Sequence, residues 1–237
     1  MKIFLSLLIA LITLTFAAQQ NPFLMVKKID SPTHISFKSI SERLEKNIPS
    51  IAVDKANWKA FPYAPEVSFK MAHDSEKLYL KFYVTEAHIL AQHSKPNTAT
   101  HRDSCVEFFI DPDQSGGYYN FEFNCIGTTH LAYGPDRYER TFIDPQKIKN
   151  SLFIESTLGN QPFEEKSGHF KWEMVVAIPS SIFVQHPNLT FNTLHSKANF
   201  FKCGDDTTKP HYLSWSPIDT PNPDFHRPEF FGNIVFD

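Results

Sequence analysis

Apolar and polar side chains alternate through residues 102–126, on both sides of a glycine-containing turn. Successive side chains of a β-strand point to opposite faces, so this alternation predicts two strands that pair as an antiparallel hairpin. One face of the hairpin is apolar and is formed by Val106, Phe108, Ile110, Phe121, Phe123 and Cys125. The opposite face places Glu107 beside Glu122 and Asn124 across the ladder. Taken alone, this polar face is typical of the solvent-exposed side of a half-buried sheet.

The same two-residue period returns in short runs over most of the chain. The further runs are 67–71, 78–84, 152–157, 170–178, 189–194, 199–203 and 233–236. Turn-forming residues such as Asp74 and Ser75 separate them. Many short strands at this spacing predict an all-β fold, an antiparallel β-sandwich or jelly roll. A capping box at Ser39 and Glu42 predicts one short N-terminal helix that ends near Asn47.

Composition agrees with short strands and ordered loops rather than with helix bundles. The 237 residues include 23 Phe, 8 Tyr and 3 Trp, and 17 Pro against 8 Gly. Aromatic residues favour strands, and proline favours turns. The formal net charge of −3 gives no basic footprint for nucleic acid. At this length we expect one large sandwich domain, residues 51–237.

The first residues are typical of a secretory signal peptide. Lys2 provides the positive start, residues 3–16 are largely apolar, and small residues around Ala17 suit a cleavage site. The apolar run is shorter than the roughly 20 residues that a spanning helix needs, so cleavage is favoured over a membrane anchor. We therefore expect a signal peptide at 1–18, an N-terminal segment at 19–50, and no membrane span after cleavage. The mature protein is expected to be secreted, periplasmic or on the cell surface.

Three cysteines limit the chain to one internal disulfide. Cys125 falls on the apolar face and is expected in the core, whereas Cys105 and Cys203 could pair. No pair of Cys or His residues shows the spacing of zinc ligands, and the sequence contains no Gly-x-Ser-x-Gly elbow. The sequence therefore supports neither a zinc site nor a nucleophilic hydrolase.

The hairpin turn carries oxygen ligands in the order of a calcium-binding loop. The first, third, fifth, sixth and twelfth positions of that pattern are Asp111, Asp113, Ser115, Gly116 and Glu122. Such a loop normally lies between two helices, whereas the flanks here are expected to be strands. We interpret the match as mostly accidental, and we retain Asp111 and Asp113 as candidate ligands of a structural calcium ion.

Aromatic residues gather between prolines near the end of the chain. Residues 211–232 contain Trp215, Phe225, Phe230 and Phe231. Proline fixes the backbone and lowers the cost of presenting a rigid loop. A flat aromatic ring on such a loop suits the C–H face of a sugar. Trp215 is a candidate platform that could equally pack in the core, and the Phe side chains are expected to pack beneath the loop.

Several segments occur together in a recognisable order: Trp58, 78–82, 103–112, 118–124, Trp172 with 176–179, and 215–232. Through this ordered set the chain resembles a family 9 carbohydrate-binding module, within the broader DOMON-like group of sandwiches. The resemblance extends over residues 51–236, and it points to a subgroup of secreted proteins from polysaccharide-degrading bacteria. It implies a β-sandwich that binds an oligosaccharide or polysaccharide, of plant or algal type, without cleaving it. It also implies a role alongside glycoside hydrolases.

The resemblance further implies which residues bind the sugar. Members of the family hold a sugar between two Trp rings, with polar side chains around it and calcium ions in structural roles. Glu107 matches the acidic position, Asn124 matches a polar sheet position, and Trp215 matches the C-terminal aromatic. His101 stands where the first Trp is expected, so we expect Trp215 and His101 to form the stacking surface. Polar contacts are then expected from Glu107, Asn124, Arg102 and Asp103, with no cofactor required.

Two other functions stay open at this point. Glu107 and Glu122 could act as the carboxylate pair of a glycoside hydrolase. Some DOMON-like sandwiches hold haem between Met and His ligands, which makes Met71 and Met174 candidate ligands in a haem-binding electron carrier. The alternation, however, places both methionines in the core, and the sequence contains no haem-attachment motif.

Overall fold

The computed structural model describes residues 21–237. The predicted signal peptide, residues 1–18, lies outside this part of the chain. The described part contains thirteen strands, two α-helices and three short 3-10 helices. In chain order the elements are β1 (Phe23–Lys28), α1 (Phe37–Glu45), β2 (Ile51–Ala52), β3 (Glu66–His73), β4 (Lys77–Ala91), η1 (Thr100–Arg102), β5 (Cys105–Asp111), β6 (Tyr118–Asn124), β7 (Thr129–Gly134), β8 (Thr141–Phe142), α2 (Pro145–Ser151), β9 (Phe153–Ser156), β10 (Phe163–Pro179), η2 (Ser180–Ile182), β11 (His195–Cys203), β12 (Tyr212–Ser214), η3 (Pro228–Phe230) and β13 (Gly232–Phe236).

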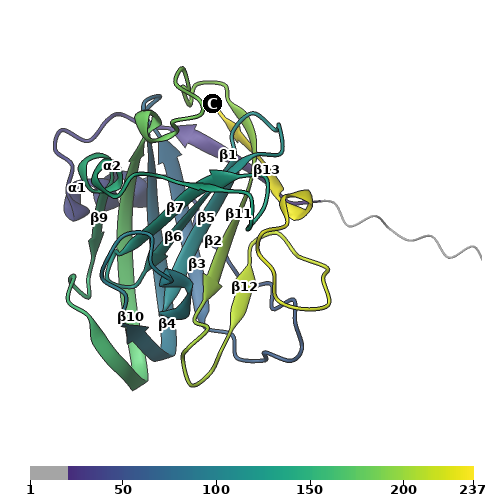
Figure 1. Cartoon of the computed structure of the whole chain (residues 1–237). Coiled ribbons are helices and arrows are strands. Elements are labelled where there is room, and N and C mark those ends of the chain that lie inside the picture. The colour runs from purple at the N-terminus through teal and green to yellow at the C-terminus, as the bar shows by residue number, and fades with distance from the viewer. Residues whose placement is uncertain (1–20) are drawn as a thin grey trace, which may run out of the picture.

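The strands form two layers that share strand β1 (Figure 1). The first sheet has the order β8-β7-β6-β5-β11-β13, with β12 paired to β11. The second sheet has the order β3-β4-β10-β9, with β2 paired to β3. Strand β1 pairs with β13 through its first part and with β3 through Lys27 and Lys28. The all-β sandwich predicted from the alternation is confirmed.

Strand β1 is the main difference from the predicted antiparallel sandwich. It runs parallel to both β13 and β3, whereas the other strand pairs within residues 21–237 are antiparallel. Parallel neighbours need a long connection, and β1 is joined to β3 through α1 and β2. The N-terminal segment expected at 19–50 therefore contributes a strand to the sandwich, which begins before residue 51.

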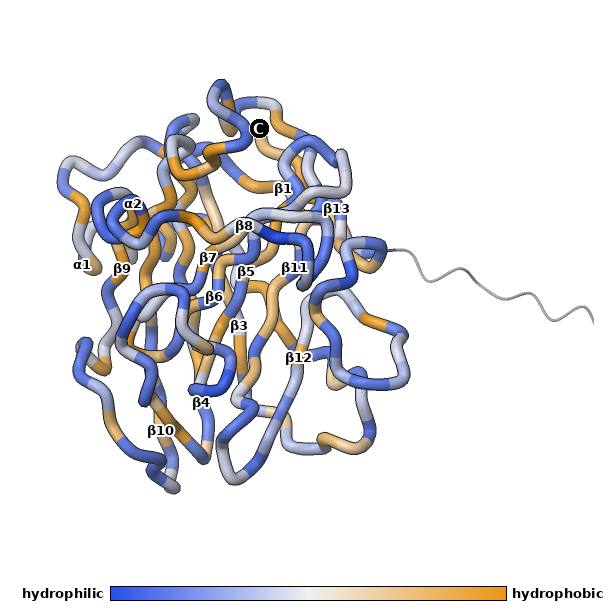
Figure 2. Tube along the Cα trace, viewed as in Figure 1, coloured by the Kyte–Doolittle hydropathy of each residue, from blue (hydrophilic) through white to orange (hydrophobic). Residues whose placement is uncertain are grey.

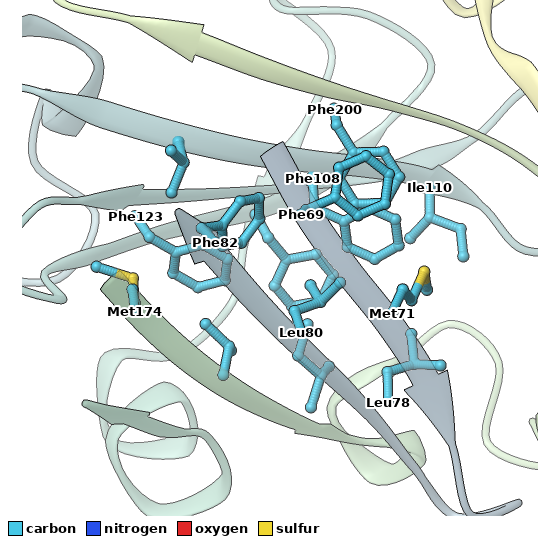
Figure 3. Close-up of a cluster of buried hydrophobic side chains, with 14 of the residues drawn as sticks. Phe69, Met71, Leu78, Leu80, Phe82, Phe108, Ile110, Phe123, Met174 and Phe200 are labelled. Atoms are coloured by element: carbon cyan, nitrogen blue, oxygen red, sulfur yellow. The ribbon is translucent and has the colours of Figure 1, made fainter. Parts of the chain in front are cut away.

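The core lies between the two sheets and is rich in aromatic side chains (Figure 3). Phe69 of β3 stacks on Phe200 of β11 with 3.6 Å between the ring centroids, and Phe200 also stacks against Phe108 of β5 at 4.9 Å. Each fully buried aromatic side chain stabilises the fold by roughly 1.5–3 kcal/mol through removal from water. Met71 and Met174 lie in the same core, as the alternation predicts.

Helix α1 covers the outer face of the second sheet. Ile40 and Leu44 are fully buried there, against residues of β3, β4 and β10. The helix begins after Ser36, whose side chain accepts the backbone N–H of Ser39 in a capping box. The predicted box at Ser39 and Glu42 is thus three residues too late, although the short helix itself is present. No helix within residues 21–237 is both long enough and apolar enough to span a membrane.

The hairpin of β5 and β6 has the predicted register. Glu107 pairs with Glu122 across the ladder, and Cys105 pairs with Asn124. Cys125, directly after β6, lies in the core between the sheets, as predicted. The alternation in this stretch therefore determined both the pairing and the face on which each side chain lies.

One predicted strand, residues 189–194, is a loop in the structure. The backbone N–H of Phe191 donates to the carbonyl of Ser75, and Thr193 has a φ of +53°, which is outside the extended region. The apolar spacing there serves to bury Phe191 without forming a ladder. Along the rest of the chain, apolar residues are concentrated in the strands and hydrophilic residues are frequent in the connecting loops (Figure 2).

Candidate functional site

The outer face of the first sheet carries a row of side chains with polar groups at its centre. Glu107 of β5, Glu122 of β6 and His130 of β7 are register partners in neighbouring strands, and Phe201 of β11 continues the row. These side chains face away from the core because their neighbours along each strand point into it. All four are nevertheless buried, so another part of the chain must cover them.

The C-terminal segment, residues 216–231, lies over this face. Phe225 stacks on Phe201 with 4.2 Å between the ring centroids and 11° between the rings. Trp58 packs against Phe225 and donates its Nε1–H to the carbonyl of Thr220 at 2.9 Å, which holds the segment in place. In Figure 1 the segment is the yellow loop beside β12. The polar face is therefore covered rather than open to solvent.

A pocket of about 310 Å³ remains between the sheet and the covering segment. The aromatic lining residues are Phe61, Tyr212 and Phe225, and the rings of Phe61 and Tyr212 pack edge to face at 4.8 Å. The polar and ionisable lining residues are His101, Glu107, Glu122, Arg137, Arg140, Cys203, Asp205, Asp224 and His226. A lining that combines aromatic rings with many hydrogen-bonding groups suits a small polar ligand that also has an apolar face.

Glu122 anchors the polar part of the pocket. Its carboxylate accepts hydrogen bonds from Thr100 Oγ1 at 3.1 Å and from Asn120 Nδ2 at 2.8 Å. The rings of His101 and His130 lie 3.6 Å and 3.8 Å from it. Burial alone would raise the pKa of Glu122, but the contact with His101 and the charges of both histidines hold it well below its usual range. The same contact raises the pKa of His101, so this pair favours an imidazolium beside a carboxylate.

Glu107 has the opposite electrostatic environment. Its Oε1 lies 3.1 Å from Cys203 Sγ and 3.9 Å from Cys105 Sγ, and both sulfur atoms are buried. Burial and the nearby charge of Glu122 raise the pKa of Glu107 well above its usual range. The pocket therefore presents two neighbouring carboxyl groups whose pKa values are shifted in opposite directions, which favours Glu107 as a hydrogen-bond donor and Glu122 as an acceptor.

Two arginines complete the pocket from the loop after β7. Arg137 Nη2 is paired with Asp224 Oδ1 at 2.7 Å. Arg140 Nη1 lies 4.0 Å from the carboxylate of Glu122 and is buried, with no hydrogen-bond partner among the described residues. Nearby, burial raises the pKa of Asp205 to about 6. Arg140 thus offers a free N–H donor that a ligand oxygen could satisfy.

A family model described as carbohydrate-binding family 9 matches residues 39–236 of this chain, which is most of its length. The chain belongs to this family. The resemblance expected from the ordered motifs is therefore confirmed.

Solved structures agree with the family 9 assignment. A provisionally named carbohydrate-binding protein from Bacteroides uniformis ATCC 8492 is 38% identical, with a TM-score of 0.88, and the match covers 92% of this chain and 100% of that one. Two structures of a family 9 module from Caldicellulosiruptor kristjanssonii, in complex with glucose and with cellotriose, are 14% and 12% identical, with TM-scores of 0.56 and 0.55. They cover 91% of this chain and 96% and 93% of their own, and at that identity they show the shared fold. A search of the curated proteins found no match.

Only part of the site predicted for this family 9 chain lies at the pocket. His101 and Glu107 line it, and so does Glu122, which the sequence indicated only as half of a carboxylate pair. Lining residues that sequence reasoning missed are Phe61, Arg137, Arg140, Asp205, Tyr212, Pro223, Asp224 and His226. The last four belong to the aromatic and proline-rich stretch 211–232. The arginines follow no pattern that sequence reasoning could have used.

Trp215, the expected stacking platform, lies in the core instead. Its side chain is only 7% exposed, and its ring packs edge to face against Phe69 at 6.5 Å and against Phe200 at 6.0 Å. The alternation at β12 explains this correction: Tyr212 faces the pocket, so Leu213 and Trp215 turn toward the core. A ring in this position has no face available to a sugar.

Asp103 and Asn124 form an internal network rather than a ligand contact. Both are fully buried, and Asn124 Nδ2 donates to Asp103 Oδ2 at 2.8 Å. Asp103 also accepts the backbone N–H groups of residues 92–93, each at 2.9 Å. Arg102 is exposed and lies 3.8 Å from Asp206. None of these three predicted contact residues is among those that line the pocket.

The carboxylates of the hairpin turn lie apart from this pocket. Asp111 accepts the N–H of Gly116 through one oxygen at 2.9 Å, while its other oxygen, Oδ1, is buried and has no partner among the described residues. Asp113 is about half exposed and lies 3.4 Å from His186. Glu122, the twelfth position of the calcium-loop pattern, belongs to the pocket instead. The flanks of the turn are strands, as expected, and Asp111 presents an unsatisfied buried oxygen of the kind that a calcium ion binds.

Proposed function

We propose that this family 9 protein binds a carbohydrate in the pocket on the outer face of its first sheet. The observation that carries the proposal is the composition of the pocket. The rings of Phe61, Tyr212 and Phe225 offer apolar surface to the C–H face of a sugar, and the polar lining residues offer hydrogen-bonding groups for its hydroxyls. Family membership supports the same function.

Each polar group has a distinct role in this proposal. Glu122 accepts a hydrogen bond from a sugar hydroxyl, and Glu107, whose raised pKa favours the protonated form, donates one. Arg140 Nη1 donates to a ligand oxygen, which would satisfy a buried N–H that has no partner among the described residues. A site that pairs donors with acceptors in this way discriminates strongly against ligands that lack the matching hydroxyls.

The volume supports a short ligand. About 310 Å³ is at the lower end of the roughly 300–1,000 Å³ usual for small-molecule sites, so we propose that the pocket holds one or two sugar units at a chain end. The Caldicellulosiruptor kristjanssonii module was solved with glucose, a single sugar unit, and with cellotriose, which has three. We further propose that the glycan is of plant or algal type, that the protein is secreted or attached to the cell surface, and that it assists glycoside hydrolases without being catalytic.

Isothermal titration with ligands chosen from a glycan array tests the assignment of the pocket. Phe61→Ala is expected to weaken binding at least tenfold, since it removes one of the aromatic rings that line the pocket. Arg140→Gln is expected to weaken binding by roughly 1–3 kcal/mol through the loss of a charged donor. Phe23→Ala removes a ring that is 61% exposed and is not among the residues that line the pocket, so it is the matched control and should bind normally. Equal binding by Phe61→Ala, Arg140→Gln and the wild type would mean that the ligand lies elsewhere.

One observation favours a second candidate function, glycoside hydrolysis. Glu107 and Glu122 are direct cross-strand partners whose pKa values are shifted in opposite directions, which is how an acid and a base are set apart. Reducing-sugar release from the ligands that bind best tests this, with Glu107→Gln and Glu122→Gln as controls. Sugar release that disappears in both variants would establish a hydrolase. Binding without release would establish a binding module.

The proposal includes a structural calcium ion at the hairpin turn, although binding of the sugar itself requires no cofactor. The support is the buried, unpartnered Oδ1 of Asp111 next to the carboxylate of Asp113. Calcium takes six to eight oxygen ligands, so backbone carbonyls and water would have to complete the set.

A further inference from the structure

Two cysteines that are remote in sequence meet on the outer face of the first sheet. Cys105 of β5 and Cys203 of β11 are direct register partners in an antiparallel pair. Glu107 follows two residues after Cys105 on the same strand, so its side chain lies on the same face. The three side chains are fully or almost fully buried, and the three residues carry two thiols and one carboxyl group.

The three side chains converge on a common point. Glu107 Oε1 lies 3.1 Å from Cys203 Sγ and 3.9 Å from Cys105 Sγ. The two sulfur atoms and a carboxyl oxygen of Glu107 all lie within 4.8 Å of one another. A tetrahedral zinc ion with Zn–S of about 2.3 Å and Zn–O of about 2.1 Å separates its ligand atoms by roughly 3.6–3.8 Å. The observed distances from Glu107 Oε1 to the two sulfur atoms, 3.1 Å and 3.9 Å, lie on either side of these ligand separations. A small shift of the side chains is therefore enough to bind an ion.

We propose that Cys105, Cys203 and Glu107 form a binding site for a thiophilic divalent cation of the zinc class, open to the sugar pocket. Two thiolates and a carboxylate are the ligands that such ions prefer, and binding would release the two thiol protons and the carboxyl proton of Glu107 to solvent. Cys203 and Glu107 line the pocket, so the fourth coordination position faces it and can take water or a ligand oxygen. The site itself does not depend on the proposed sugar binding.

The hydrogen bonds of Glu107 favour a cation over a disulfide. Within residues 21–237, the only side-chain hydrogen-bonding partners of its carboxyl group are the two thiols. Oxidation of the thiols to a disulfide would remove both S–H donors and leave a buried carboxyl group without a partner, which is costly. A bound cation instead gives that group and both sulfur atoms a ligand bond.

Cobalt titration of the reduced protein tests the site directly. Co²⁺ substitutes for Zn²⁺ and gives a thiolate-to-metal absorption band together with the visible bands of tetrahedral cobalt. We expect one Co²⁺ per chain in the wild type, displaced by Zn²⁺. Cys125→Ser is the matched control, since Cys125 lies in the core and outside the three-residue group, and it should retain the bands. Cys105→Ser and Cys203→Ser should lose the thiolate band.

Glu107→Gln keeps both thiols and should weaken cobalt affinity at least about tenfold. If a Cys→Ser variant does not fold, this variant still tests whether the three side chains bind the ion. Circular dichroism identifies which variants are folded. A reduced wild-type protein without the thiolate band would overturn the proposal. So would a band that survives in folded Cys105→Ser and Cys203→Ser. Suppose that the isolated protein has a mass two hydrogen atoms below that of the fully reduced chain, and that it binds no cobalt after reduction. That result would show that Cys105 and Cys203 form a disulfide instead.

Discussion

The ammonium group of Lys202 lies 2.8 Å from the carboxylate of Glu86, and this ion pair joins the two sheets inside the sandwich. Lys202 belongs to β11 of the first sheet and Glu86 to β4 of the second, and both side chains are completely buried. Trp172 Nε1 donates to the other carboxylate oxygen at 2.7 Å, and His211 Nε2 lies 2.8 Å from the ammonium. Each charge is therefore balanced by close partners in a site without water contact.

Breaking this pair from one side should be strongly destabilising. Lys202→Met leaves Glu86 as an uncompensated buried carboxylate, so we expect a loss of ~3–5 kcal/mol in the free energy of unfolding, measured with urea. The double variant Lys202→Met with Glu86→Gln should lose less than the sum of the single changes, because the two residues interact. Lys70→Met, which breaks the more exposed pair of Lys70 and Glu45, serves as a control and should cost less. A cost below about 1 kcal/mol for Lys202→Met would contradict this account of the pair.

Trp215→Ala should affect stability and not sugar recognition. The ring fills the core against Phe69 and Phe200, so its removal leaves a cavity and should cost ~3–5 kcal/mol of unfolding free energy. Protein that remains folded at low temperature should bind the glycan as the wild type does. Circular dichroism in urea and titration calorimetry measure the two quantities. A stable Trp215→Ala protein that no longer binds would restore Trp215 as the stacking platform.

Acid should destabilise the fold through His211. Burial first, and then the charge of Lys202, lowers the pKa of His211 to about 2, whereas in the unfolded chain it is close to 6.5. Between these two values only the unfolded chain takes up the proton, so this contribution to stability is lost progressively as the pH falls below about 6.5. From pH 7 to pH 5 the loss is about 2 kcal/mol.

The raised pKa of Asp205 has the opposite effect on stability over the same pH range, because there the folded chain takes up the proton more readily than the unfolded chain. The effect of His211 is therefore measured by comparing a His211 variant with the wild type. His211→Gln should show a smaller decrease in unfolding free energy than the wild type between pH 7 and pH 5, as measured by urea unfolding at both values. Identical pH profiles for the two proteins would show that His211 is not the group responsible.

Calcium should stabilise the protein through the hairpin turn. A calcium concentration one hundred times the dissociation constant would add about 2.7 kcal/mol to the free energy of unfolding, visible as a rise in Tm that a chelator reverses. Asp111→Asn removes one of the two candidate carboxylates and should abolish the rise. Asp54→Asn, an exposed change outside the turn, should leave it unaffected. A Tm that is the same with calcium and with chelator would rule out the calcium site.

The hairpin of β5 and β6 was predictable because its information is local. Alternation assigns each side chain to a face, and a short turn leaves little choice of register, so the pairing of Glu107 with Glu122 followed from the residues alone. The prediction of a strand at 189–194 was wrong because the same alternation of apolar and polar residues can also bury Phe191 in a loop. The position of Trp215 could not be decided for a similar reason, since an aromatic ring beside prolines fits a core as well as it fits a surface.

The sequence by itself determined the all-β sandwich and the face on which Glu107, Glu122 and the cysteines lie, because the two-residue period of a strand is a local property. The tertiary structure alone decided that this face is covered by residues 216–231 and becomes a pocket. It alone brought Cys105 beside Cys203, placed Arg140 at the pocket and turned Trp215 inward. Those outcomes depend on which distant strands pair and on which loop buries its rings against them, and no local periodicity encodes that choice.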